Sequence, residues 1–259
     1  MDLSFALAGL VVGVLVGTTG VGGGSVMTPV LTAGFGVPPA IAVGTDLVFA
    51  ALTKTAGTAV HRLQDSVDWR VTRLLCTGSL PAAALTVAAL AVMGVHSKSA
   101  AIEIGLAIAL LGTAALMLLG DRANRLLRWC RPTRGAAPAL ATIACGFALG
   151  GMVTLTSVGA GALGATMLLT LYPQMRAVRI AGTDIAHAVP LASVAGLGHF
   201  WLGAVDLSLL TGLLVGSIPG IAIGAVIGKR LPDRLLRRVL AITLIGVALF
   251  LLIKRIWPA

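Results

Sequence analysis

The sequence has 259 residues, of which 58% are hydrophobic and only 11% are charged, and its mean hydropathy is +1.01. In soluble proteins about a quarter of the residues are charged, so this composition excludes a soluble enzyme or binding protein. The formal net charge of +10 comes from basic residues in loops beside apolar segments, where membrane topology and anionic lipid account for it. We therefore expect contact with a lipid bilayer and no nucleic-acid partner.

The apolar segments are long enough to cross a hydrocarbon core of about 30 Å as helices, and they lack the alternating pattern of a membrane β-barrel. The sequence therefore predicts an all-α integral membrane protein. Its three cysteines form no CxxC or His-rich pattern, so we expect neither a disulfide framework nor a metal site. We expect no cofactor.

The first apolar segment is interrupted at Thr18 to Val26 by the stretch TTGVGGGSV. Glycine and serine also allow membrane helices to pack closely, and packing would explain one such stretch standing alone. A matching stretch, TSVGAG, occupies Thr156 to Gly161 in the second half of the chain. The recurrence favours a functional turn over simple packing.

Other motifs recur in the same order along the chain. The GTD of residues 44–46 returns 138 residues later at 182–184, and the GSLP of residues 78–81 returns at the same offset as GSIP at 216–219. Many transporters are built from two related halves. The sequence predicts two repeats, residues 1–119 and 137–259, joined by a basic linker at residues 120–136.

The basic residues predict how these halves cross the membrane. Fifteen of the 19 Lys and Arg residues lie in four loops that we expect to be cytoplasmic, at residues 62–73, 120–136, 176–179 and 229–238. The second and third of these loops share one side only if the segment between them enters the membrane and returns. Each half is then a re-entrant hairpin followed by three spans, giving ten helical segments. The halves are inverted relative to each other, with both termini outside.

In the first half, this topology predicts hairpin arms at residues 5–17 and 25–35 and spans at residues 38–60, 71–93 and 100–119. The hairpin turns fall near the middle of the bilayer, where non-helical backbone must be buried in protein or line a polar cavity. The second arm of each hairpin starts at its turn, so free N–H groups and the helix dipole favour an anion there. The candidate substrate-binding residues are Thr18, Thr19, Gly22, Gly23, Gly24, Ser25, Thr156, Ser157, Gly159, Ala160 and Gly161.

Four titratable residues lie deep inside the predicted spans: Asp46, Lys54, Asp184 and His187. Asp184 and His187 are three residues apart on one helix face, so the pair could carry a proton coupled to anion movement. Alternatively, Asp46 and Asp184 are structural and hold the adjacent turns by hydrogen bonds. Lys54 either lies in the anion path or extends to the cytoplasmic interface.

Pro81 and Pro219 follow Gly-Ser within two spans, so we expect them to kink these helices and to act as candidate hinges.

The stretches VGGGSVMTPVL, GTD, SVGAG, GTDIAHAVPL and GSIPGI occur in this order and resemble the sulfite exporter TauE/SafE family, the 4-toluene sulfonate uptake permeases. The resemblance covers essentially the whole chain. It implies secondary transport of small anions such as sulfite, sulfoacetate or sulfonates across the bacterial inner membrane. One departure is that Phe49 stands in the first half where His187 stands in the second.

We expect transport by alternating access, with protons as a candidate coupling ion, and the alternative is a passive anion channel. An enzyme is not expected, because the sequence has no HExxH motif and no nucleophile paired with a base. The sequence leaves the anion, the direction of transport and the oligomeric state open.

Overall fold

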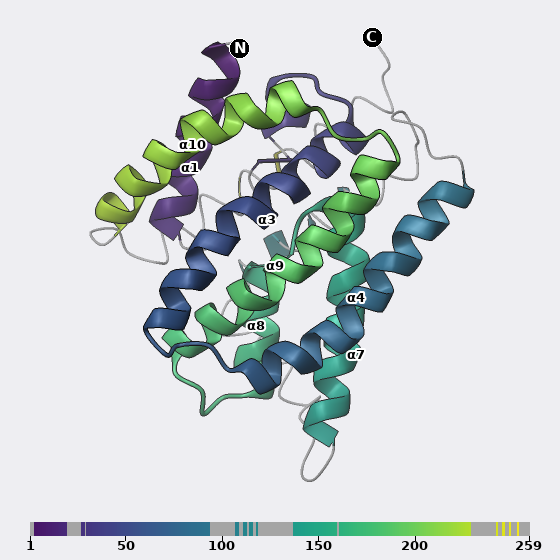
Figure 1. Ribbon diagram of the computed structural model, residues 1–259, viewed down its shortest axis with the longest axis vertical. Helices are drawn as coiled ribbons and strands as arrows, with labels where there is room; N and C mark the ends of the chain where they lie inside the picture. Colours follow the sequence, from purple (N-terminus) through teal and green to yellow (C-terminus); the bar gives the residue numbers. More distant parts are fainter. Residues whose placement is uncertain are drawn as a thin grey trace.

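The computed structural model describes residues 3–19, 27, 28, 30–93, 137–159 and 161–228, together with isolated helical positions between 107 and 118 and between 242 and 253. Within these residues the regular structure is entirely helical (Figure 1). The elements are α1 (Leu3–Thr19), the π-helical η1 (Val30–Gly34), α3 (Pro39–Leu63), α4 (Trp69–Val92), α7 (Ala137–Thr156), α8 (Ala162–Leu171), α9 (Ala177–Trp201) and α10 (Leu207–Gly228).

Five helices of the described part are long and apolar enough to cross a membrane, in α3, α4, α7, α9 and α10. This confirms the all-α membrane class. α3 and α4 match the spans expected at residues 38–60 and 71–93 within a few residues. The third expected span of the first half, residues 100–119, falls mostly outside the described residues, and the linker at residues 120–136 falls wholly outside them.

Aspartates begin two of the long helices. Asp68 caps α4, because its side chain accepts from the N–H groups of Arg70 and Val71. At the start of α10, Asp206 Oδ1 accepts from the N–H groups of Ser208 and Leu209 at 2.8 and 3.0 Å. The Ser208 hydroxyl and these N–H groups hold the pKa of Asp206 below its usual value. Both caps satisfy donors that a helix start otherwise leaves open.

The second half contains a helical hairpin made by α7 and α8. The helix stops after Thr156, and Ser157, Gly159 and Gly161 all have positive φ before α8 begins. The Thr142 and Tyr172 hydroxyls form a 2.7 Å hydrogen bond that ties the start of α7 to the end of α8. The chain therefore returns to the end of the molecule from which α7 starts, and α8 begins directly after the TSVGAG stretch, where the second arm of the hairpin was expected.

The first half makes a similar return. The rings of Phe5 and Phe35 lie 5.5 Å apart, and these positions match Thr142 and Tyr172 at an offset of 137 residues. The sequence placed the turn from Thr18 onwards, but α1 remains helical to Thr19. Helix α7 likewise keeps its last threonine, Thr156, whose hydroxyl donates to the Met152 carbonyl one turn earlier.

The helices pack in pairs that cross between the two halves. α1 lies along α10, α4 lies along α7, and α3 and α9 cross the centre of the molecule (Figure 1). In both outer pairs the backbones touch at glycine. A side chain at Gly13 would overlap the backbone of Ser217, and one at Gly150 would overlap the backbone of Ser79. Each outer pair therefore joins one helix from each half by backbone contact.

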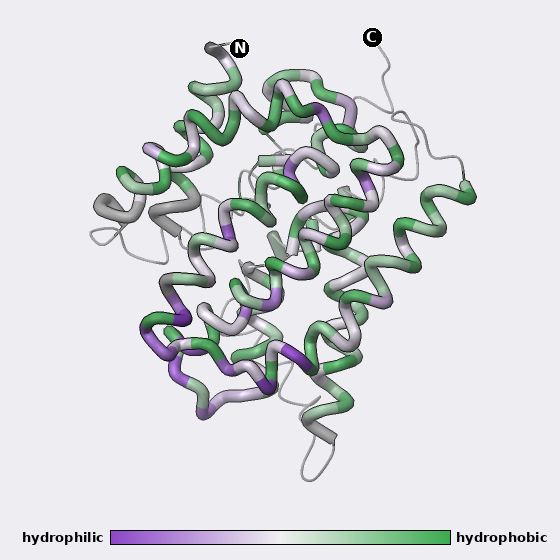
Figure 2. Tube along the Cα trace, in the orientation of Figure 1, coloured by the Kyte–Doolittle hydropathy of each residue, from purple (hydrophilic) through white to green (hydrophobic). Residues whose placement is uncertain are grey.

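The two ends of the molecule differ in polarity. α3 ends and α4 and α9 begin at one end, where the trace is markedly hydrophilic (Figure 2). We call this the basic end, because it carries Arg62, Arg70, Arg73, Arg176 and Arg179. The base of the α7–α8 hairpin packs here, since Tyr172 and Leu168 contact Val71 and Ile180. The start of α3 and the residues joining α9 to α10 lie at the opposite end, where Ala40, Leu202 and Ala204 share one apolar cluster.

We predict that Gly150→Ala destabilises the protein and that Gly151→Ala, its neighbour in α7, does not. A methyl at Gly150 meets the Ser79 backbone, which is overpacking that costs about 1–3 kcal/mol. A methyl at Gly151 meets only Thr86 Oγ1 at 3.7 Å, an ordinary contact. Thermal unfolding in detergent measures the difference. Equal melting temperatures for the two variants would refute the close contact of α4 and α7.

Candidate functional site

The GTD motifs at residues 44–46 and 182–184 each reach across to the other half of the chain. A side chain at Gly44 would overlap the backbone of Ala204, and one at Gly182 would overlap the backbone of Ser66. Both glycines therefore press against the loop that follows the central helix of the other half. The fit leaves no room for a larger residue at either position.

The threonines of the two motifs bind the capping aspartates. Thr45 Oγ1 accepts from the N–H of Asp206 at 3.0 Å, and Thr183 Oγ1 accepts from the N–H of Asp68 at 2.9 Å. The start of α10 is thus fixed to α3, and the start of α4 is fixed to α9. The same two residue types make the same bond at each end of the molecule.

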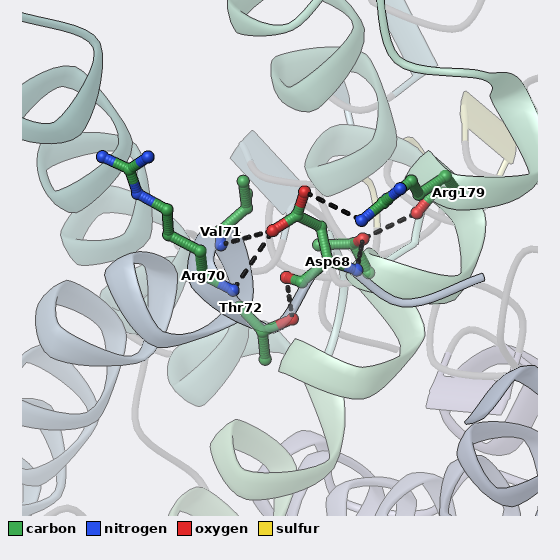
Figure 3. A network of polar contacts seen from close by, with 6 residues as sticks. Asp68, Arg70, Val71, Thr72 and Arg179 are labelled. Atoms are coloured by element: carbon green, nitrogen blue, oxygen red, sulfur yellow. Dashed lines mark hydrogen bonds and ion pairs between the residues drawn. The ribbon is translucent and has the colours of Figure 1, made fainter. Parts of the chain in front are cut away.

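The capping aspartates differ in one contact, which Asp68 makes at the basic end. Figure 3 shows Asp68 between the start of α4, where its carboxylate accepts from Arg70 and Val71, and Arg179 of α9. Arg179 Nη2 lies 3.5 Å from Asp68 Oδ2. At the equivalent position in the first half the chain has Ile41, which forms no ion pair with Asp206. The ion pair therefore belongs to the basic end alone.

Asp46 is fully buried and holds the segment that follows the first glycine-rich stretch. Its Oδ2 accepts from Thr28 twice, from the backbone N–H at 3.2 Å and from the hydroxyl at 2.6 Å. Ser157, from the turn of the other hairpin, lies near enough to interact with the carboxylate. Asp46 Oδ1 and Ser157 Oγ nevertheless form no well-oriented hydrogen bond within the described residues. Asp46 thus lies between the two hairpins.

Asp184 is also buried, with 3% of its surface exposed, but its surroundings differ. Its Oδ1 occupies the place where a side chain at Gly164 would begin, in the first turn of α8. No described residue donates a hydrogen bond to this atom. The carboxylate therefore packs directly against the N-terminal turn of the short hairpin helix.

His187 lies one turn beyond Asp184 and links α9 to α4. Its Nε2 is 2.8 Å from Ser79 Oγ, and both side chains are buried. Its Nδ1 has no hydrogen-bond partner in the described part of the chain. The expected pair therefore shares a face of α9, but His187 makes its hydrogen bond to Ser79 of the GSLP motif.

Lys54 lies two turns beyond Asp46 on α3, and only 6% of its surface is exposed. Its ammonium group interacts electrostatically with Asp46, Asp184 and His187. A lysine that extended to the interface would be exposed, so the burial argues against that alternative. The four titratable residues form one central cluster.

The turn between α7 and α8 is the non-helical backbone next to this cluster. Gly161 begins α8 with no side-chain cap, and Ser157 Oγ is buried without a partner in the described region. The Thr156 hydroxyl donates to the Met152 carbonyl in its own helix and accepts from the N–H of Val158. Of the remaining expected binding residues, Thr18 and Thr19 are in the last turn of α1, while Gly22, Gly23, Gly24, Ser25 and Ala160 lie outside the described residues.

Pro81 and Pro219 lie inside α4 and α10, as expected, on exposed positions beside buried serines. The residues that sequence reasoning missed are Thr28, Ser79 and Gly164. Ser79 could have been found, because the GSLP motif repeats. Thr28 and Gly164 carry no repeated signal, since their importance comes only from the aspartates that pack against them. Within the described residues, no three His, Cys, Asp or Glu side chains gather as metal ligands.

These features define a multi-pass helical membrane protein with an enclosed polar centre. The sulfite exporter TauE/SafE family matches residues 5–251, and the protein belongs to this family of membrane transporters. It is 38% identical to the probable membrane transporter protein YjnA of Bacillus subtilis (strain 168) over 246 residues, which cover 93% of this chain and 96% of that protein.

A second relative is the probable membrane transporter protein YunE of Bacillus subtilis (strain 168). It is 36% identical over 69 residues, which cover 27% of this chain and 25% of that protein. No solved structure matches the chain.

We predict that Thr28→Val destabilises the protein by about 1–3 kcal/mol, because the buried Asp46 loses a hydroxyl donor. Thr86→Val is the matched control, since the Thr86 hydroxyl donates only to the Ala82 carbonyl of its own helix. The measurement is the denaturation midpoint of both variants in detergent. Equal shifts would show that the Thr28–Asp46 bond does not hold the first hairpin.

Proposed function

We propose that this protein is a secondary transporter that moves a small organosulfur or sulfite-like anion across the bacterial inner membrane by alternating access. The observation that carries the proposal is the interrupted α7–α8 hairpin, whose turn meets a buried cluster of Asp46, Lys54, Asp184 and His187. Buried charges inside a membrane protein are costly and mark transport pathways.

The anion site is the turn at residues 157–161 together with the matching glycine-rich stretch of the first half. α8 turns its uncapped N-terminus and its positive dipole end towards the centre of the protein. The Ser157 hydroxyl supplies a donor, and Lys54 supplies a positive charge. A sulfonate or sulfite oxygen is an acceptor that fits such donors.

The two halves act as inverted repeats. Support comes from contacts that recur at equivalent positions, such as Thr45 with Asp206 and Thr183 with Asp68. The positions of the hairpin bases support it as well. The base of the α7–α8 hairpin lies at the basic end. Phe5, at the base of the first hairpin, packs in one cluster with Leu209 at the start of α10, which is at the opposite end. The basic end is cytoplasmic, following the excess of arginine there.

The moving units each combine both halves. Backbone contact at glycine joins α1 to α10 and α4 to α7, so each pair moves as one body against the central α3 and α9. Pro81 and Pro219 remove a hydrogen bond from α4 and α10 and act as the hinges. Because His187 binds Ser79, the state of the centre is transmitted to the hinge region of α4.

A glycine substitution at the hairpin turn tests the site. We expect Gly161→Val to reduce anion counterflow in proteoliposomes by roughly tenfold or more, because Gly161 has φ of 132° at the start of α8. Gly36→Val is the control, since Gly36 also has positive φ (65°) but a side chain there meets nothing within 4 Å. Similar flux in the two variants would refute the site.

The anion itself is found by thermal shift with sulfite, thiosulfate, sulfoacetate, isethionate, taurine and simple carboxylates, since a bound ligand stabilises the folded state. Counterflow with that anion then distinguishes a carrier from the passive channel. A carrier exchanges labelled for unlabelled anion against the gradient, whereas a channel only equilibrates the label.

The orientation is tested by labelling in a variant without native cysteines. We expect Arg70→Cys to react with a membrane-impermeant maleimide only from the cytoplasmic side, and Gly203→Cys only from the outside, because the two positions lie at opposite ends of the molecule. Labelling of Arg70→Cys from the outside would reverse the assignment.

A further inference from the structure

The two GTD motifs have the same three residues and unequal surroundings, and the difference falls on their aspartates. Asp46 accepts from both the N–H and the hydroxyl of Thr28. At the offset of 137 residues, Thr28 corresponds to Ala165, which has no hydroxyl and whose N–H already donates to the Gly161 carbonyl. Asp184 therefore lacks the donors that hold Asp46.

We propose that Asp184 carries a coupling proton during transport, and that Asp46 is a fixed structural ligand of the first hairpin. The proposal rests on the proposed function, because a proton can be coupled only to an anion that is carried. It assigns different roles to two aspartates that the repeat makes equivalent.

A buried carboxylate oxygen without a donor is costly when it is ionised, and among the described residues none donates to Asp184 Oδ1, so Asp184 needs either a proton or a positive partner. Lys54 interacts with Asp184 across the boundary between α3 and α9. Two states follow. With a proton on Asp184, the Lys54 ammonium serves the anion at the turn, and with Asp184 ionised, Lys54 is held by the carboxylate and the anion is released.

The groups around Asp184 limit which other residue could carry the proton. α3 presents Lys54 and Asp46, α9 itself presents His187, and α7 and α8 contain no acidic or basic residue within their bounds. From α4, Ser79 engages His187 Nε2. His187 is therefore a positioning residue that connects the cluster to α4.

The contact with Gly164 explains how protonation of Asp184 affects binding of the anion. Asp184 Oδ1 packs against the first turn of α8, the same helix whose N-terminus faces the anion at the turn. A negative charge on Asp184 competes with the anion for that helix terminus and for Lys54. Asp184 binds one proton from water on the side from which the anion comes and releases it to water on the other side, so one proton moves with each anion.

The test compares Asp184→Asn, Asp46→Asn and His187→Gln with the wild-type protein in proteoliposomes. The probe is whichever of sulfite, sulfoacetate and isethionate raises the wild-type melting temperature most. Counterflow and accumulation driven by a pH gradient are measured for each protein. We expect Asp184→Asn to keep counterflow, to lose accumulation, and to show a flux that no longer changes between about pH 5 and 8. His187→Gln and Asp46→Asn should transport the probe more slowly but keep a flux that changes with pH, and Asp46→Asn unfolds at a lower temperature.

The outcomes separate the two proposals. Absence of wild-type counterflow with all three anions refutes the proposed function. Wild-type counterflow without a response to a pH gradient, or accumulation by Asp184→Asn equal to wild type, refutes only the role of Asp184. Loss of accumulation in His187→Gln with retention in Asp184→Asn refutes it as well.

A spectroscopic measurement covers the case in which Asp184→Asn does not fold. Infrared difference spectra on addition of the probe should show a carboxylic-acid band in the wild-type protein and in Asp46→Asn. Absence of the band in the wild-type protein, or its loss in Asp46→Asn, would overturn the assignment.

Discussion

In hydrocarbon, every N–H and C=O that a broken helix releases needs a partner inside the protein. This constraint governs the α7–α8 hairpin, where positive φ at Ser157, Gly159 and Gly161 ends one helix and starts another. The Thr156 hydroxyl and the bonds from α8 to Gly159 and Gly161 satisfy much of the turn. The rest of the molecule encloses it, since α3 and α9 run antiparallel through the centre and the outer pairs pack around them.

Enclosure at this depth depends on how closely the helices approach. Backbone contact at Gly13 and Gly150 brings α10 and α4 against the first arms of the hairpins, so that Ser217 and Ser79 become buried. Close approach removes lipid from the centre, and the charged side chains there interact with one another instead of with hydrocarbon. The polar centre thus depends on small residues in the outer helix pairs, since Gly150 contacts Ser79, whose hydroxyl binds His187.

Much of the architecture was predictable from the sequence because it follows from periodic or repeated signals. Apolar length predicted α3 and α4, and the recurrence of TSVGAG predicted a turn at residues 156–161, which the structure has from Ser157 to Gly161. The boundary at Thr18 was placed too early, because threonine can satisfy its own hydroxyl within a helix and gives no stop signal.

The detailed contacts of the candidate site could not be predicted in this way. The burial of Lys54 depends on the antiparallel packing of α3 against α9, which no local pattern encodes. The partner of His187 is Ser79, which is 108 residues away in the chain. The inequality of Asp46 and Asp184 arises from Thr28 and Ala165, two positions whose neighbours in space are set only by the folded hairpins.

The ion pair between Arg179 and Asp68 makes the two ends of the protein energetically unequal. An exposed pair of this kind is worth about 0–1 kcal/mol, and half of the Arg179 side chain is exposed. Separation of α9 from α4 at the basic end would break it, while at the opposite end the equivalent described residues, Ile41 and Asp206, form no ion pair. In the alternating-access cycle that we propose, 1 kcal/mol would correspond to a bias of about fivefold between the two conformations. In that proposed cycle, a single arginine would favour the conformation in which α9 and α4 stay together at the basic end.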